Sequence, residues 1–132
     1  MPRSTRALLV LAVLAAAAAF GRPAHAQGIY GAVAISSSTG VYGYGYNYDT
    51  ARGAQDRAMQ ECRQRSQATD CRVYANFQRA CFALAKAGNN AFGWAIGYPN
   101  DERSERALNE CAFRNGADCK VVEQFCSGTT AR

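Results

Sequence analysis

The stretch VYGYGYNY (Val41–Tyr48) occurs again in altered form as AFGWAIGY (Ala91–Tyr98), 50 residues further along the 132-residue chain. Two further pairs of segments match at shifts of 49 and 48 residues: Ala58–Cys62 with Ala107–Cys111, and Asp70–Val73 with Asp118–Val121. A repeat present in only two copies is typical of one pseudo-symmetric domain rather than of a solenoid. We therefore divide the chain into repeat one (29–78) and repeat two (80–128).

Each copy predicts the element order β-β-α-β. In repeat one the expected first strand, second strand, helix and third strand are Ile29–Ile35, Val41–Tyr48, Ala51–Arg65 and Arg72–Phe77. In repeat two the same elements are Ala80–Ala85, Ala91–Tyr98, Asp101–Asn115 and Lys120–Cys126. Five-residue turns rich in Ser, Gly and Asn join the first two strands of each copy. The expected class is α+β: two pseudo-symmetric β-β-α-β repeats, with an antiparallel sheet packed on two helices and three disulfides.

The expected helix ends carry capping residues. Thr50 or Asp49 is available to cap the first helix, and Asn100 the second, since all three side chains can accept a backbone N–H. Gly116 is placed to end the second helix in a left-handed conformation.

The second strand of each copy has a large face and a small face, because successive side chains of a strand point in opposite directions. The large faces carry Tyr42, Tyr44, Tyr46, Tyr48, Phe92, Trp94, Ile96 and Tyr98. The first helix carries a stripe of small residues at Ala51, Ala54, Ala58 and Cys62. We expect the aromatic faces to meet the small-residue stripes of the helices and form the core. The glycine face (Gly43, Gly45, Gly93 and Gly97) predicts tight twisting of the hairpin or packing on the sister copy, with close approach of a ligand or a second backbone as the alternative.

The first 26 residues have the layout of a secretory signal peptide. Arg3 and Arg6 precede the uncharged run Ala7–Phe20, and Ala24-His25-Ala26 is a small-x-small cleavage site. A run of this length is too short to span a bilayer, and no longer apolar run follows it. We expect residues 1–26 to be cleaved, residues 27–132 to form a single domain, and that domain to be secreted or periplasmic without a membrane span.

Removal of this segment excludes several functions. It carries Arg3, Arg6 and Arg22, so the net charge falls from +5 to +2, too low for a nucleic-acid-binding face. His25 is the only histidine, so no Ser-His-Asp or Cys-His site can form and the commonest zinc ligand besides cysteine is absent. We expect no metal, no cofactor and no enzymatic activity.

Six cysteines in a small exported domain predict three disulfides. Equivalent positions of the two repeats should have equivalent partners, and this leaves one further pair. The predicted bridges are Cys62–Cys71, Cys111–Cys119 and Cys81–Cys126.

These features together resemble an exported bacterial family named domain of unknown function 4189. The resemblance covers about Tyr30–Gly128 and rests on Tyr30-Gly31-Ala32, Tyr42-Gly43-Tyr44, Cys62, Asp70-Cys71-Arg72-Val73, Cys81, Phe92-Gly93-Trp94, Cys111, Asp118-Cys119 and Phe125-Cys126-Ser127-Gly128. It implies a secreted or periplasmic bacterial protein and carries no catalytic residues with it.

Four groups of residues are candidate sites. The tyrosines Tyr42–Tyr48 form either core or a sugar-stacking platform, and the strand-end residues Tyr48 and Tyr98 are the candidate binding surface. The other three groups have simple structural explanations. The acids Asp49, Asp101, Glu102 and Glu105 are expected to complement helix dipoles rather than to act as glycosidase acids, and Asp70 and Asp118 are expected to be turn acids. The arginines are expected to form a solvated face rather than a site for an acidic partner: Arg52, Arg57, Arg63, Arg65 and Arg72.

The sequence favours a non-enzymatic binding module for an unknown protein or glycan partner, and it specifies no oligomeric state. One alternative is an inhibitor or immunity protein that plugs an envelope-degrading enzyme with the turn Ser36–Gly40 or Lys86–Asn90. A hydrolase with paired carboxylates is the other alternative.

Overall fold

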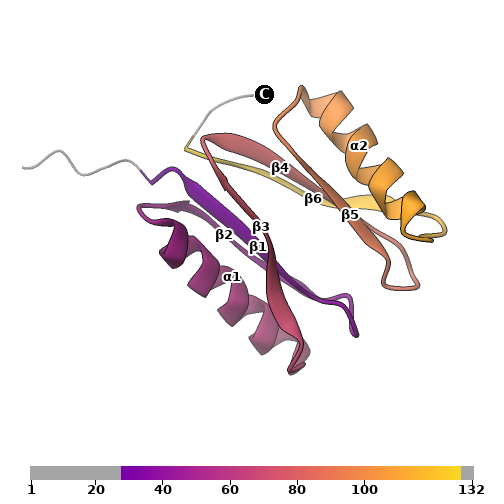
Figure 1. Ribbon diagram of the computed structural model, residues 1–132, viewed down its shortest axis with the longest axis horizontal. Helices are drawn as coiled ribbons and strands as arrows, with labels where there is room; N and C mark the ends of the chain where they lie inside the picture. The colour runs from indigo at the N-terminus through magenta and orange to yellow at the C-terminus, as the bar shows by residue number, and fades with distance from the viewer. Residues whose placement is uncertain (1–27, 129–132) are drawn as a thin grey trace, which may run out of the picture.

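The computed structural model describes residues 28–128 and contains the predicted element order twice (Figure 1). The elements are β1 (Tyr30–Ser36), β2 (Tyr42–Tyr48), α1 (Ala51–Ser66), β3 (Cys71–Gln78), β4 (Ala80–Lys86), β5 (Phe92–Ile96), α2 (Asn100–Phe113) and β6 (Lys120–Ser127). The α+β class with β-β-α-β units is confirmed. The predicted signal peptide lies outside the described residues.

The antiparallel strands are divided between two three-stranded sheets, one for each repeat. Their orders are β2-β1-β3 and β5-β4-β6, so the first strand of each repeat is central and the second and third are edges. Rings from β2 contact β6, and rings from β5 contact β3. These reciprocal contacts are those expected of two units related by an approximate two-fold axis.

The two sheets face each other, and each carries its own helix on its outer face (Figure 1). The largest buried side chains lie between the sheets, among them Val33, Ile35, Phe82 and Leu84. Smaller clusters of alanine and cysteine lie beneath α1 and beneath α2. The molecule therefore has four layers in the order helix, sheet, sheet, helix.

The predicted contact between the aromatic faces and the helices is wrong except at the strand-end Tyr48, which packs against the alanine cluster beneath α1. The rings point between the two sheets, where Tyr44 stacks on Phe125 at 4.8 Å and Phe92 meets Tyr74 edge-on at 5.0 Å between centroids. The glycine faces meet the helices instead. A Cβ built on Gly43 would lie 2.3 Å from the Ala58 carbonyl oxygen, so the helix backbone rests directly on the strand.

Gly93 has the same role in repeat two, since a Cβ there would lie 2.2 Å from the Cys111 amide nitrogen. The expected packing of the glycine face on the sister copy is therefore wrong at Gly43, Gly45 and Gly93. The alternative, close approach of a second backbone, is what occurs, and that backbone belongs to the helix of the same repeat. Large rings cannot fit into so narrow a gap, so they occupy the wider layer between the sheets.

Two of the three expected helix caps differ from prediction. Thr50 caps α1 as expected, its hydroxyl oxygen accepting from the Gly53 amide at 3.0 Å. Asn100 is the first residue of α2 rather than its cap; the cap position is Pro99, which offers no side-chain acceptor. Gly116 is not left-handed, because Asn115 takes that conformation with φ 64°. Gly116 is required for close approach: a Cβ there would lie 2.4 Å from the Cys119 sulfur.

The three disulfides join the cysteines in the predicted pairs. Cys62–Cys71 and Cys111–Cys119 tie the last turn of each helix to the third strand of the same repeat. Cys81–Cys126 links register partners on β4 and β6. Among the described residues all three bridges lie within a repeat, so the contact between the repeats depends on packing and hydrogen bonds.

Candidate functional site

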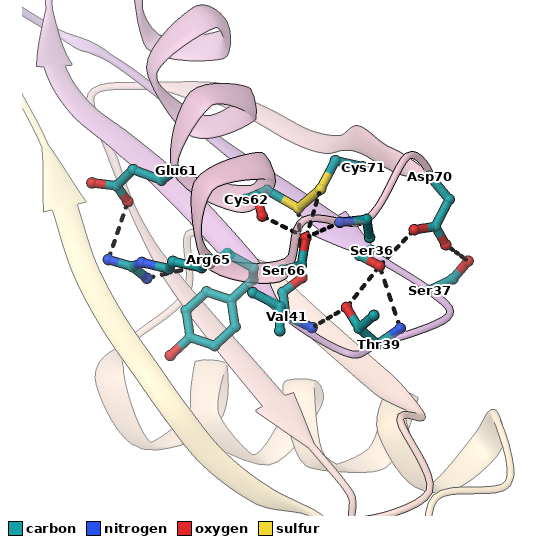
Figure 2. The surroundings of a disulfide bond; sticks show 12 residues. Ser36, Ser37, Thr39, Val41, Glu61, Cys62, Arg65, Ser66, Asp70 and Cys71 are labelled. Atoms are coloured by element: carbon teal, nitrogen blue, oxygen red, sulfur yellow. Dashed lines mark hydrogen bonds and ion pairs between the residues drawn. A yellow bond between two sulfur atoms is a disulfide. The ribbon is translucent and has the colours of Figure 1, made fainter.

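One polar cluster surrounds the Cys62–Cys71 disulfide (Figure 2). Asp70 accepts hydrogen bonds from the Ser36 hydroxyl at 2.6 Å, the Ser38 amide at 2.9 Å and the Ser37 hydroxyl at 3.2 Å. The Ser36 bond, followed by that from the Ser38 backbone, lowers the pKa of Asp70 from its usual 3.8 to about 2. The carboxylate therefore holds the first hairpin turn closed.

This cluster is unsuited to nucleophilic catalysis. Ser36 is fully buried, and its hydroxyl donates to a carboxylate whose low pKa makes it a weak base. The equivalent acid, Asp118, has a left-handed φ of 54°, and its carboxylate makes no hydrogen bond within residues 28–128. The stability of the turn is thus the role that the geometry gives Asp70.

Asp70 makes the stability of the fold depend on pH. A carboxyl whose pKa is lower in the folded state stabilises that state above its unfolded pKa, and the contribution disappears as pH falls through the folded pKa. We expect urea unfolding of the protein to lose part of its stability between about pH 4 and pH 2. The Asp70→Asn variant should be less stable at neutral pH and should lose less between these two pH values. Identical pH profiles for the two proteins would contradict this assignment.

A groove lies between the second strand and the helix of each repeat, and the two grooves are built from equivalent residues. Groove one, of about 330 Å³, is lined by Tyr44, Tyr46, Tyr48, Arg57 and Glu61. Groove two, of about 490 Å³, is lined by Trp94, Ile96, Tyr98, Arg106, Asn109 and Glu110. The repeat thus builds the same surface twice, and the second copy is the more open.

Side chains of α1 close groove one. Glu61 accepts from the Tyr44 amide at 3.2 Å and pairs with Arg57 at 2.6 Å. Arg65 donates to the Tyr42 carbonyl at 3.3 Å and lies 3.4 Å from Glu61, a pair visible in Figure 2. The open edge of β2 is therefore covered by charged side chains.

The equivalent side chains of α2 are arranged differently. Glu110, which matches Glu61, pairs with Arg114 at 2.7 Å instead of reaching the strand. Arg114, which matches Arg65, lies over the Trp94 ring at 4.7 Å. Arg106 lies over the Tyr98 ring at 4.0 Å and pairs with Glu102 at 2.9 Å. In groove two the guanidinium groups therefore lie over aromatic rings, and within residues 28–128 no α2 side chain forms a hydrogen bond to the backbone of β5.

Tyr98 is held in an unusual conformation at the end of groove two. Its φ is 58°, directly after Gly97 with φ 80°, and half of its side chain (50%) is exposed. A left-handed aromatic residue persists only where its surroundings enforce it, and such residues are frequent at functional sites. Its exposure and backbone make Tyr98 the most distinctive residue of the groove.

Arg103 enforces this conformation. It is only 4% exposed, and its guanidinium donates to the carbonyls of Tyr98 at 2.8 Å and Gly97 at 3.2 Å and to the Asn100 amide oxygen at 2.9 Å. Burial lowers the pKa of Arg103, and its Nε finds no hydrogen-bond partner among residues 28–128. The sequence pattern did not single out Arg103; the available signal was that Arg103 occupies the position of the buried Ala54 of repeat one.

Loss of Arg103 should destabilise the fold. The Arg103→Ala variant leaves the carbonyls that hold the β5–α2 turn unsatisfied, and hydrogen bonds to a charged group contribute about 1.5–3 kcal/mol each. We expect a loss of about 3 kcal/mol in chemical denaturation, with Arg103→Lys in between because an ammonium lacks the fork of donors. A loss below about 1 kcal/mol for Arg103→Ala would contradict the proposed support of Tyr98.

The two predicted surface tyrosines lie in equivalent grooves but differ in exposure. Tyr98 is half-exposed in groove two, whereas Tyr48 is half-buried in groove one. Tyr42 and Tyr44 pack against the inter-sheet core, and burial, reinforced by Glu123, raises the pKa of both phenols. The tyrosines of β2 are therefore mainly core, with Tyr46 48% exposed at its edge.

The remaining candidates do not assemble into a reactive centre. The carboxylates of Asp49, Asp101 and Glu105 are exposed, and Glu102 pairs with Arg106. Arg52 pairs with Asp56 along the outer face of α1. Within residues 28–128 no three His, Cys, Asp or Glu side chains come together as metal ligands. No helix in the same range is both long and apolar enough to cross a membrane.

The fold defines a class of small disulfide-bonded α+β modules made of two equivalent units, each with a groove beside its edge strand. The chain belongs to the family described as Domain of unknown function (DUF4189), whose model matches residues 30–126. This confirms the family resemblance of the sequence. No curated protein and no solved structure matches the chain.

Proposed function

We propose that the protein is an exported, non-enzymatic binding module and that groove two is its ligand site. One observation carries this proposal: two equivalent grooves exist, and within residues 28–128 only the second has an edge strand whose backbone forms no hydrogen bond to a side chain and a strand-end tyrosine that is half-exposed. Three disulfides support export, because such bridges persist in oxidising compartments. A module stabilised in this way loses little conformational freedom when it binds.

A protein partner fits this groove better than a glycan. Sugar rings bind aromatic side chains by stacking on an open ring face. Here Arg106 covers one face of Tyr98, and Arg114 lies over Trp94. Exposed arginine and aromatic side chains together are the residue types enriched at protein interfaces.

Site-specific photocrosslinking tests the proposal. A photoreactive amino acid placed at Tyr98 should crosslink a component of the cell envelope, and excess unlabelled protein should abolish the product. The matched control places the same group at Arg52, an exposed position of α1. Equal products from both positions, or none from Tyr98, would contradict groove two as the site.

The inhibitor alternative rests on a different observation. Both hairpin turns lie at one end of the molecule, where the Asn90 side-chain amide donates to the Ser38 carbonyl at 3.1 Å and Asp70 fixes the first turn. Fixed turns of this kind are suited to insertion into an enzyme cleft. A crosslinker at the exposed Thr39 distinguishes the alternatives, since an inhibitor would crosslink a hydrolase from Thr39 and not from Tyr98.

A further inference from the structure

The backbone of β5 is open along one edge. Ala91 and Gly97 form hydrogen bonds on the β4 side of the strand. The Ala91 carbonyl accepts from the Ala87 amide at 2.9 Å, and the Gly97 amide donates to the Cys81 carbonyl at 2.9 Å. Backbone groups alternate in direction along an antiparallel strand. Because β5 is an edge strand, the amides and carbonyls of Phe92, Trp94 and Ile96 point away from the sheet, and no side chain of residues 28–128 bonds to them.

In repeat one the equivalent strand edge is closed by hydrogen bonds from side chains of α1. At the equivalent positions of β2, Glu61 binds the Tyr44 amide and Arg65 binds the Tyr42 carbonyl. In repeat two the equivalent Glu110 and Arg114 pair with each other. The same two residue types therefore protect one edge and leave the other available.

β5 also lacks the other features that protect edge strands. Strands β2, β3 and β6 each pair with their central strand through a register shift, whereas the β4–β5 register runs without one. β5 contains no charged residue. Bulges and charges are the usual means of preventing a further strand from pairing, so a regular, uncharged edge is a template for one.

The charges beside this edge indicate what kind of strand fits. Arg114 lies over Phe92 and Trp94, in the first half of β5, and Arg106 lies over Tyr98, just past its end. Arg106 and the C-cap residue Arg114 are eight residues apart along α2, which corresponds to about 12 Å and is close to the length of four residues of extended chain, about 13 Å. Residues four apart on a strand point to the same side. Two carboxylates spaced in this way can therefore pair with both arginines.

We propose that the β5 edge binds an extended segment of a partner protein as an added antiparallel or parallel strand, with acidic side chains about four residues apart facing Arg106 and Arg114. This inference rests on the proposed function and specifies the ligand class of groove two. Backbone hydrogen bonds to Phe92, Trp94 and Ile96 supply affinity, and the arginine pair supplies selectivity. The two arginines exchange their surface ion pairs with Glu102 and Glu110, which are weak because they are partly exposed to solvent, for pairs with the segment.

Selection from a phage-displayed library of short linear peptides tests this proposal. Peptides selected on the oxidised protein should share two acidic residues at this spacing. A synthetic copy of the best peptide should slow amide exchange at Phe92, Trp94 and Ile96. Methylation of alternate peptide amides, those facing β5, should abolish binding, whereas methylation of the intervening amides should not.

A pair of charge-reversal variants tests the arginines. The double variant Arg106→Glu, Arg114→Glu should weaken the acidic peptide by roughly tenfold or more and should select peptides with basic residues instead. The control variant Arg52→Glu, Arg63→Glu makes the same charge change at exposed positions of α1 outside both grooves and should bind like the parent protein. Circular dichroism and thermal unfolding establish that both variants are folded.

Three results would overturn strand addition: selected peptides without the acidic pair, protection of amides outside β5, or failure to select any peptide. Self-association of the protein with protection of β5 would overturn it as well, because the occupant would then be a second copy. Each of these results leaves the photocrosslinking from Tyr98 unaffected, so failure of strand addition is distinguishable from failure of the proposed function.

Discussion

Reduction of all three disulfides is expected to unfold the protein at neutral pH and room temperature. In the chain-entropy model, the Cys81–Cys126 bridge, whose ends are separated by 45 positions in the sequence, stabilises the fold by about 4 kcal/mol. The two short bridges, with separations of 9 and 8 residues, contribute about 2.6 kcal/mol each. A domain of this size has a net stability of about 5–15 kcal/mol, so a total of about 9 kcal/mol is a large part of it.

Circular dichroism and urea unfolding of the oxidised and reduced protein measure this effect. The double variant Cys62→Ala, Cys71→Ala serves as the graded control and should remain folded with a loss of about 2–3 kcal/mol. A reduced protein that kept a cooperative unfolding transition of unchanged midpoint would show that the layers, and not the disulfides, maintain the fold.

Substitution of the strand glycines beneath the helices should have the second largest effect. A Cβ at Gly93 would lie 2.2 Å from the Cys111 amide nitrogen and 2.6 Å from the Ala107 carbonyl oxygen, and both are backbone atoms of α2. The helix has to move away from the sheet to admit a methyl group, which also loosens the buried alanines around it. We expect Gly93→Ala, and Gly43→Ala in repeat one, to destabilise the fold by about 3 kcal/mol each.

Gly88→Ala is the matched control, because a Cβ at Gly88 meets no atom within 4 Å. This substitution should leave the free energy of unfolding unchanged or raise it slightly, since alanine restricts the unfolded chain. If Gly93→Ala and Gly88→Ala unfolded at the same urea concentration, the direct contact between helix and strand would be wrong.

The repeat predicted much of this fold because it constrains local structure and disulfide pairing together. Cys62 and Cys111 occupy the same position in the two units, so their partners follow from equivalence, and the structure has the bridges so predicted. The side of β2 and β5 that meets the helix could not be predicted in the same way. Alternation shows that a strand has two faces, but which one is covered by a helix depends on whether another sheet is available to bury the rings.

The features of groove two depend on tertiary contacts that a local pattern does not reveal. Tyr98 was a candidate from its place at the strand end, yet its conformation is set by Arg103, which replaces the buried Ala54 of repeat one. Asn100 has the side chain of a helix cap, but the guanidinium of Arg103 takes its amide oxygen. Differences between the repeats, rather than their shared residues, therefore support groove two as the proposed binding surface.

The central claim is that repeat one closes its edge strand and repeat two leaves it open, and amide hydrogen exchange in the free protein tests this claim most directly. Nuclear magnetic resonance resolves the Tyr44 and Trp94 amides, which occupy equivalent positions. The Tyr44 amide, bound to Glu61, should exchange roughly tenfold or more slowly than the Trp94 amide. The difference should disappear in the Glu61→Ala variant. Equal exchange of the two amides in the parent protein, or slower exchange at Trp94, would contradict the claim.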